Sequence, residues 1–186
     1  MTSKQDQNNL VWLDLETTGL DPDSCVILEI ATIITDKDLN IIAEGPDLVI
    51  HQPEGVLVFM DEWCDKQHRI SGLIEESRNA TISLAEAEQE TITFVARYCP
   101  PRACPLCGNS ICFDRRFLIK HMPKLDAFLS YRNIDVSSIK ELVSRWYINK
   151  TIGSSKTAKH RAIADIRESI EELRSYRKTV FRQPER

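Results

Sequence analysis

The order of apolar and polar residues predicts three consecutive strands in the first fifty residues. Residues 9–16 alternate in the manner of a strand with two different faces. Residues 25–35 are rich in β-branched side chains, which favours a second strand. The residues Asp36-Lys37-Asp38 are typical of a turn into a third strand at about 40–50. Three strands joined by short connections predict an antiparallel meander.

Strands and helices alternate along the rest of the chain. Short apolar runs at 106–112 and 131–136 predict a fourth and a fifth strand. Strand–helix alternation after a meander predicts an α/β fold with a mixed five-stranded sheet, the later strands parallel, flanked by helices. We expect a single domain over residues 1–186, with a core at about 9–180.

Capping residues and apolar spacing predict the helices. Ser83 and Glu86 form one capping box, which opens a helix to about residue 98, and Ser138 and Glu141 form another, which opens a helix to about residue 147. A further helix is predicted at 115–129, with a break at its proline. The last helix is predicted from about 160 to 178, because isoleucine and leucine recur there at spacings of three and four.

Composition and charge limit the kind of partner. The apolar fraction of 42% and the charged fraction of 28% are ordinary for a globular protein. The net charge is −4. Proteins that hold a long polynucleotide through many phosphates usually carry a strong basic surface. If the substrate is a nucleic acid, we therefore expect it to be short or gripped at one end.

Apolar stretches and cysteines indicate the compartment. No run is long enough to span a bilayer, and the first ten residues lack the apolar core of a signal peptide, so we expect a cytoplasmic protein that does not bind membranes. Six cysteines are then expected to be free thiols. Cys104-Pro-Leu-Cys107 resembles half of a zinc knuckle, but Cys99 and Cys112 each lie five residues away and do not make a second close pair, which favours thiols without metal.

Asp14 and Glu16 are the first candidates for chemistry. Both lie two residues apart on one face of the first strand, so their carboxylates can reach a common point. They could be solvent-exposed acids of an edge strand. However, the strand is apolar on both faces, which predicts a central strand, where paired acids are costly unless a cation compensates them. Metal ligation is the favoured interpretation.

Asp114, His160 and Asp165 are weaker candidates when each is taken alone. Asp114 follows the fourth predicted strand and could simply be a helix N-cap. His160 and Asp165 lie at the predicted start of the last helix, where a surface histidine and an acid favoured by the helix dipole are ordinary. Taken together, four acids can hold two divalent ions, Mg²⁺ or Mn²⁺, for phosphoryl chemistry. His160 could then take a proton from water.

Six stretches of the chain resemble one enzyme family. LDLETTGL, GNSICFDRRFL and HRAIADIRESIEEL resemble the three motifs of the DEDDh 3′-to-5′ exonucleases. AEGPDLVIHQP, WCDKQHRISGL and YRNIDVSSIKELVSRWY resemble the oligoribonuclease group within them. The resemblance covers about residues 10–180. It implies a ribonuclease H-like fold, a homodimer, and release of nucleoside monophosphates from the 3′ end of very short RNAs, dinucleotides included.

The resemblance also implies a role for each site residue. Asp14, Glu16, Asp114 and Asp165 would bind metal, and His160 would be the general base. The remaining implied residues bind substrate or complete the site: Leu20 wedges at the terminal bases, Trp63 and His68 line the nucleotide site, Ser110 and Ser137 cap the 5′ phosphate, and Tyr131 and Arg132 reach the neighbouring subunit's site.

Simpler roles exist for several of these accessory residues. Trp63 could be plain core, Leu20 a turn-packing residue, Tyr131 an interface anchor, and Ser137 a helix cap. The chain also departs from the family pattern, because Thr17 replaces a usual Met, Phe113 a usual Gln, and Ala164 a usual acid. None of these changes removes a ligand or the base, so we expect altered affinity rather than lost chemistry.

Two alternative functions stay open on the sequence. One is a DNA-directed DEDDh exonuclease of the proofreading type. The other is a module that binds short oligonucleotides or linear dinucleotides without cleaving them. The complete set of acids argues against the second alternative.

Overall fold

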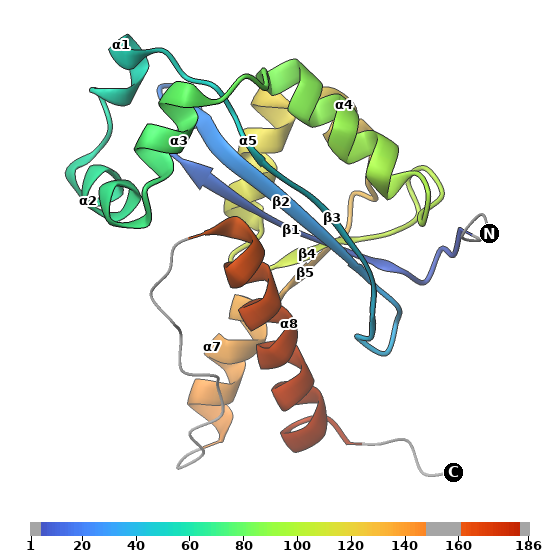
Figure 1. Cartoon of the computed structure of the whole chain (residues 1–186). Coiled ribbons are helices and arrows are strands. Elements are labelled where there is room, and N and C mark those ends of the chain that lie inside the picture. The colour runs from blue at the N-terminus through green and yellow to red at the C-terminus, as the bar shows by residue number, and fades with distance from the viewer. Residues whose placement is uncertain (1–4, 148–160, 183–186) are drawn as a thin grey trace.

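The computed structural model describes residues 5–147 and 161–182, which form a mixed five-stranded sheet with helices on both faces (Figure 1). The strand order is β3-β2-β1-β4-β5. The first three strands pair antiparallel, and β4 and β5 continue the sheet in parallel. The strands are β1 (Leu10–Thr17), β2 (Ile27–Thr35), β3 (Ile41–Val49), β4 (Leu106–Gly108) and β5 (Asn133–Asp135). The predicted fold class is confirmed, and β1 lies at the centre of the sheet as expected.

Helices cover the two faces and one end of the sheet (Figure 1). One face packs against α4 (Leu84–Val95), α5 (Cys112–His121) and α6 (Pro123–Phe128). The other face packs against α7 (Val136–Trp146) and α8 (Ala162–Thr179). Three short helices gather near the end of β1, namely α1 (Glu54–Leu57), α2 (Glu62–Ser71) and α3 (Leu73–Asn79). The sequence had left this third group without assigned structure.

The alternation of β1 produces two separate cores. Leu13 and Leu15 belong to the core under α4 to α6, whereas Trp12 is fully buried in the core under α7 and α8. The indole N–H of Trp12 donates to Thr35 Oγ1 at 3.0 Å, which satisfies its polar atom inside the core. Asp14 and Glu16 therefore share the α8 face with Trp12, as their spacing predicts.

The fourth strand and the helix after it differ from the prediction. The strand ends at Gly108, not at residue 112, because Asn109 and Ser110 form a turn in which Ser110 takes a left-handed φ of 52°. Helix α5 then begins at Cys112, so Asp114 lies in the first turn of α5 and is not its N-cap. The expectation that Cys112 belongs to a strand was wrong for the same reason.

The capping predictions had different outcomes. The capping box of Ser83 and Glu86 is present at the start of α4. The predicted box at Ser138 was wrong, because Asp135 is the N-cap of α7 and its Oδ1 accepts the N–H of Ser137 at 2.9 Å. The predicted break at Pro123 is confirmed, since this proline is the first residue of α6.

Across residues 5–147 and 161–182, no helix is long and apolar enough to cross a bilayer. The six cysteines all lie within these ranges and are free thiols.

Candidate active site

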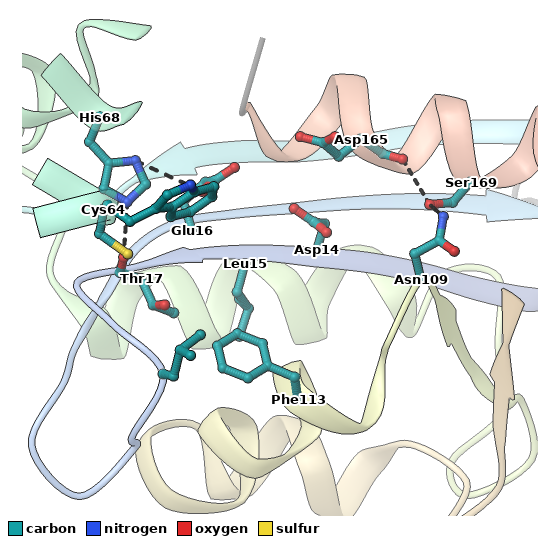
Figure 2. A pocket seen from close by; sticks show the side chains of 12 residues that line it. Asp14, Leu15, Glu16, Thr17, Cys64, His68, Asn109, Phe113, Asp165 and Ser169 are labelled. Carbon is teal, nitrogen blue, oxygen red and sulfur yellow. Dashed lines mark hydrogen bonds and ion pairs between the residues drawn. The ribbon is translucent and has the colours of Figure 1, made fainter. Parts of the chain in front are cut away.

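The centre of the candidate site is a group of three carboxylates on two elements. Asp14 and Glu16 project from β1, and Asp165 faces them from the first turn of α8 (Figure 2). One oxygen from each of the three side chains lies within 4.8 Å of the other two. Residues more than 140 positions apart in the sequence thus meet because α8 packs across β1 and β2.

Burial and crowding raise the pKa of both acids on β1. Burial raises the pKa of Asp14 well above its ordinary value, and the nearby Asp114, Glu16 and Asp165 raise it further. Burial likewise raises the pKa of Glu16 to about 8, with additional repulsion from Asp165. A cation between these carboxylates would favour their charged forms and relieve the repulsion.

The donor set fits a hard divalent cation. All three groups offer carboxylate oxygens, which Mg²⁺ and Mn²⁺ prefer over nitrogen or sulfur ligands. Within the described ranges, this is the one cluster of histidine, cysteine or acidic side chains with metal-binding geometry. The spacing of the cysteines at 99–112 therefore does not bring them together as a zinc site.

Asp114 lies next to this group but is oriented differently. Its Oδ1 accepts the backbone N–H of Leu15 at 2.9 Å, and Leu15 is the residue between Asp14 and Glu16 in the sequence. Burial raises the pKa of Asp114 to about 7, while hydrogen bonds from the backbone oppose the rise. Its charge in turn raises the pKa of Asp14. Asp114 thus anchors α5 to β1 beside the cluster, and its predicted role as a ligand stays a prediction.

A cavity of about 200 Å³ opens over the carboxylates. Three residues expected to bind substrate line it: Leu20, Trp63 and His68. The Trp63 side chain is 58% exposed and that of Leu20 is 73% exposed. These exposures rule out a plain core role for Trp63 and place both apolar side chains where a base could contact them.

His68 connects the helical wall of the cavity to the β1 strand. The side chain is buried, its Nε2 lies 2.9 Å from the carbonyl oxygen of Thr17, and its Nδ1 lies 3.9 Å from Glu16 Oε2. The carbonyl contact requires a proton on Nε2, so the neutral ring has an unprotonated Nδ1. His68 therefore holds α2 against the end of β1 while lining the cavity.

Ser110 and Ser137 form a second pair close to the cavity. Their hydroxyl oxygens are 3.1 Å apart, and Ser137 Oγ donates to Asn109 Oδ1 at 3.0 Å. Asn109 lines the cavity and donates from Nδ2 to Ser169 Oγ at 2.8 Å (Figure 2). The two serines are thus joined to the site through one amide side chain.

Tyr131 and Arg132 are exposed on the surface. Tyr131 is 78% exposed, and the guanidinium of Arg132 lies 4.9 Å from the centre of its ring. Neither residue lines the cavity of its own chain. His160 lies outside the described residues.

Several residues of the site could not be assigned from the sequence. Ser169 lines the cavity and donates its hydroxyl to the Asp165 carbonyl at 2.9 Å. Its position one helical turn after Asp165 was the available signal. Phe113 and Thr17, which depart from the family pattern, also line the cavity.

The fold and the acid cluster define the chain as a member of the exonuclease class. The exonuclease family model matches residues 11–173. The exonuclease I of Methylocaldum szegediense superposes with a TM-score of 0.69 at 19% identity, covering 92% of this chain and 41% of that chain. Another exonuclease I structure gives a TM-score of 0.72 at 16% identity, covering 95% of this chain and 42% of that chain. This chain spans about two fifths of those proteins, and the likeness shows the ribonuclease H-like fold alone.

Closer relatives narrow the class. The oligoribonuclease of Pseudomonas paraeruginosa is 56% identical over 173 residues, covering 93% of this chain and 96% of that protein. The oligoribonuclease of Alkalilimnicola ehrlichii is 54% identical over 178 residues, covering 96% and 92%. This chain therefore belongs to the oligoribonuclease family of exonucleases.

Proposed function

We propose that this protein is a 3′-to-5′ exoribonuclease that hydrolyses very short RNAs, dinucleotides included, to nucleoside 5′-monophosphates. The observation that carries the proposal is the cluster of Asp14, Glu16 and Asp165 within 4.8 Å, under a small cavity, in a chain of the oligoribonuclease family. The net charge of −4 supports a substrate with few phosphates.

Two divalent ions, Mg²⁺ or Mn²⁺, would stabilise the negative charge of the transition state and lower the pKa of the attacking water at the scissile phosphate. The carboxylates of Asp14, Glu16, Asp114 and Asp165 would hold these ions. Asp114 would either give up its hydrogen bond from the Leu15 N–H or bind an ion through its other oxygen. His160 would accept the proton of the attacking water, because a histidine titrates near neutral pH.

The apolar side chains would set the register of the substrate. Leu20 and Trp63, both exposed at the cavity, would pack on the terminal bases, and His68 would line the nucleotide pocket. Ser110 and Ser137, whose hydroxyls are 3.1 Å apart, would donate to the 5′ phosphate. A 5′-phosphate cap at a fixed distance from the clustered carboxylates would favour short RNAs over long ones.

A homodimer would complete each site. Tyr131, at 78% exposure, and Arg132, stacked on it, would reach the neighbouring subunit's site. Trp146 is also exposed on α7, which supplies apolar surface for an interface. We place this activity in the cytoplasm, where short RNA fragments arise during RNA turnover.

A product-length time course on labelled RNAs tests the proposal. RNAs of two to seven nucleotides and one long RNA would be incubated with Mn²⁺, with the Asp14→Asn variant as the inactive control. We expect the shortest RNAs to be hydrolysed fastest and monophosphates to be the first product. Faster hydrolysis of the long RNA would overturn the proposal.

Two additional measurements separate the alternatives. Higher turnover on single-stranded DNA of equal length would favour a DNA-directed exonuclease instead. Tight binding of dinucleotides without cleavage in saturating Mg²⁺ would indicate a binding module. Sedimentation of a fully active monomer would contradict the proposed dimer.

A further inference from the structure

Glu29 is a buried carboxylate that lies next to the three clustered carboxylates of the candidate site but is not one of them. It lies directly opposite Glu16 in the pairing of β1 with β2, so both side chains project toward α8. Its side chain is completely buried, yet it neither lines the cavity nor belongs to the group of carboxylates within ligand distance. A buried carboxyl group of this kind requires polar partners that compensate the loss of water.

Glu29 has two partners at the start of α8 and a third on β3, because it also shares a side-chain hydrogen bond with Asp47. The Glu29 Oε1 accepts from the Arg161 guanidinium, with Nε at 2.9 Å and Nη2 at 2.8 Å. Its Oε2 accepts the backbone N–H of Ala162 at 3.1 Å. Arg161 is the N-cap residue of α8, and its side chain forms no capping hydrogen bond among the described contacts. The Glu29 carboxylate from β2 therefore accepts a free N–H at the start of α8 in place of a side-chain cap.

Arg161 is held from a second side by α3. Its Nη1 and Nη2 donate to the two carboxylate oxygens of Glu76 at 3.0 and 2.8 Å. A single guanidinium therefore joins β2, α3 and α8, using the planar fork that lysine lacks. Asp165 follows four residues later, and its N–H donates to the Arg161 carbonyl at 3.1 Å.

We propose that Glu29 and Arg161 form a positioning pair that fixes the first turn of α8, and with it the carboxylate of Asp165, against Asp14 and Glu16. Neither residue touches substrate or metal in this role. The pair would act on metal affinity because the three clustered carboxylates sit on two elements, β1 and α8, which have to be held at one separation. The inference rests on the proposed function only for its turnover measurement.

Arg161→Met tests the positioning role, with Arg167→Met as the matched control. Arg167 lies on the same helix and pairs with Glu44 of β3 at 2.5 Å, and its side chain is 51% exposed. Three quantities would be measured for each variant: the dissociation constant of Mn²⁺ by titration calorimetry, kcat and KM on a short RNA at saturating Mn²⁺, and the thermal unfolding midpoint in EDTA.

We expect Arg161→Met to weaken Mn²⁺ binding on the order of 10–100-fold, the range seen when groups that orient metal ligands are removed. A misplaced ligand should also lower kcat on the order of 10–100-fold, with KM changed by less than about threefold. Arg167→Met should stay within about twofold in both. Mn²⁺ affinity equal to the wild type in Arg161→Met, or an equal loss in Arg167→Met, would overturn the proposal.

Arg161→Lys keeps the test decisive if Arg161→Met does not fold. Lysine retains the charge but cannot bond Glu29 and Glu76 together, so we expect a loss of Mn²⁺ affinity of about 3–10-fold. Unchanged affinity in folded Arg161→Lys would refute the positioning role. Mn²⁺ binding needs no RNA, so a wild-type protein that fails to cleave RNA would defeat the proposed function and leave this comparison intact.

Discussion

Replacing Glu16 by Gln should stabilise the metal-free protein while removing its metal-dependent activity. The Glu16 carboxylate is crowded by Asp165 and largely buried, with 13% of its side chain exposed, and its pKa rises from 4.5 to about 8. Folding therefore has to keep a proton on Glu16 that the unfolded chain has lost at neutral pH. Gln is neutral at every pH and avoids this cost.

The magnitude follows from the linkage between protonation and folding. The folded state binds more protons than the unfolded state between pH 4.5 and about 8, so this contribution to stability falls as pH rises through that range. At pH 7 the interval above 4.5 is about 2.5 pKa units, which corresponds to about 3 kcal/mol at about 1.4 kcal/mol per unit. At pH 5 the same interval gives less than about 1 kcal/mol.

Urea unfolding in EDTA at pH 5 and pH 7 measures this difference. Glu16→Gln should be more stable than the wild type by about 2–3 kcal/mol at pH 7 and nearly equal at pH 5. Glu90→Gln, an exposed position on α4, is the matched control and should change stability by less than about 0.5 kcal/mol at either pH. Adding Mn²⁺ should reverse the order, since only the wild type keeps all ligands. A Glu16→Gln protein that is no more stable than the wild type at pH 7 would refute the reasoning.

Four further outcomes are expected. Phe117→Ala should destabilise the protein by about 3–5 kcal/mol in urea unfolding, because this fully buried ring packs between α5 and the sheet; a loss under about 1 kcal/mol would contradict that packing. Ser83→Ala should cost about 1 kcal/mol by removing the capping box of α4, and an unchanged unfolding midpoint would count against it. EDTA should abolish turnover, and Mn²⁺ or Mg²⁺ should restore it; activity that persists in EDTA would exclude a metal requirement. The Mn²⁺ concentration for half-maximal activity should fall as pH rises from 6 to 8, because Glu16 and Asp114, with pKa values of about 8 and about 7, lose protons when they bind metal. A pH-independent value would show that these acids are not ligands.

The strand faces could be predicted from the sequence because a period of two is a local property. Alternation in β1 was enough to place Asp14 and Glu16 opposite Leu13 and Leu15. The apolar character of both faces also predicted that β1 is central. The predicted start of the last helix placed Asp165 in its first turn, where it is found.

Other features depend on contacts that no local pattern reveals. The start of α5 was predicted three residues too late because Ser110 adopts a left-handed φ, which is unusual for a residue with a side chain. A serine in the sequence does not indicate such a turn. The N-cap of α7 was missed because Asp135, which caps the helix, lies within the predicted fifth strand. Glu29 was not singled out, since its partner Arg161 lies 132 residues away along the chain.

The central position of β1 divides the cavity into parts of unequal rigidity. Strand β1 is paired with β2 along its whole length, with β4 at Val11 and Trp12, and its Leu15 N–H donates to Asp114. Its amides can therefore exchange with solvent only when much of the domain opens. Helix α2, which carries Trp63 and His68, buries only Cys64 and His68 among its described residues and can detach at lower cost. Hydrogen exchange should therefore protect the amides around Asp14 and Glu16 far longer than those of α2. A nucleotide could then enter and leave as α2 moves, while the strand that carries Asp14 and Glu16 keeps its conformation between turnovers.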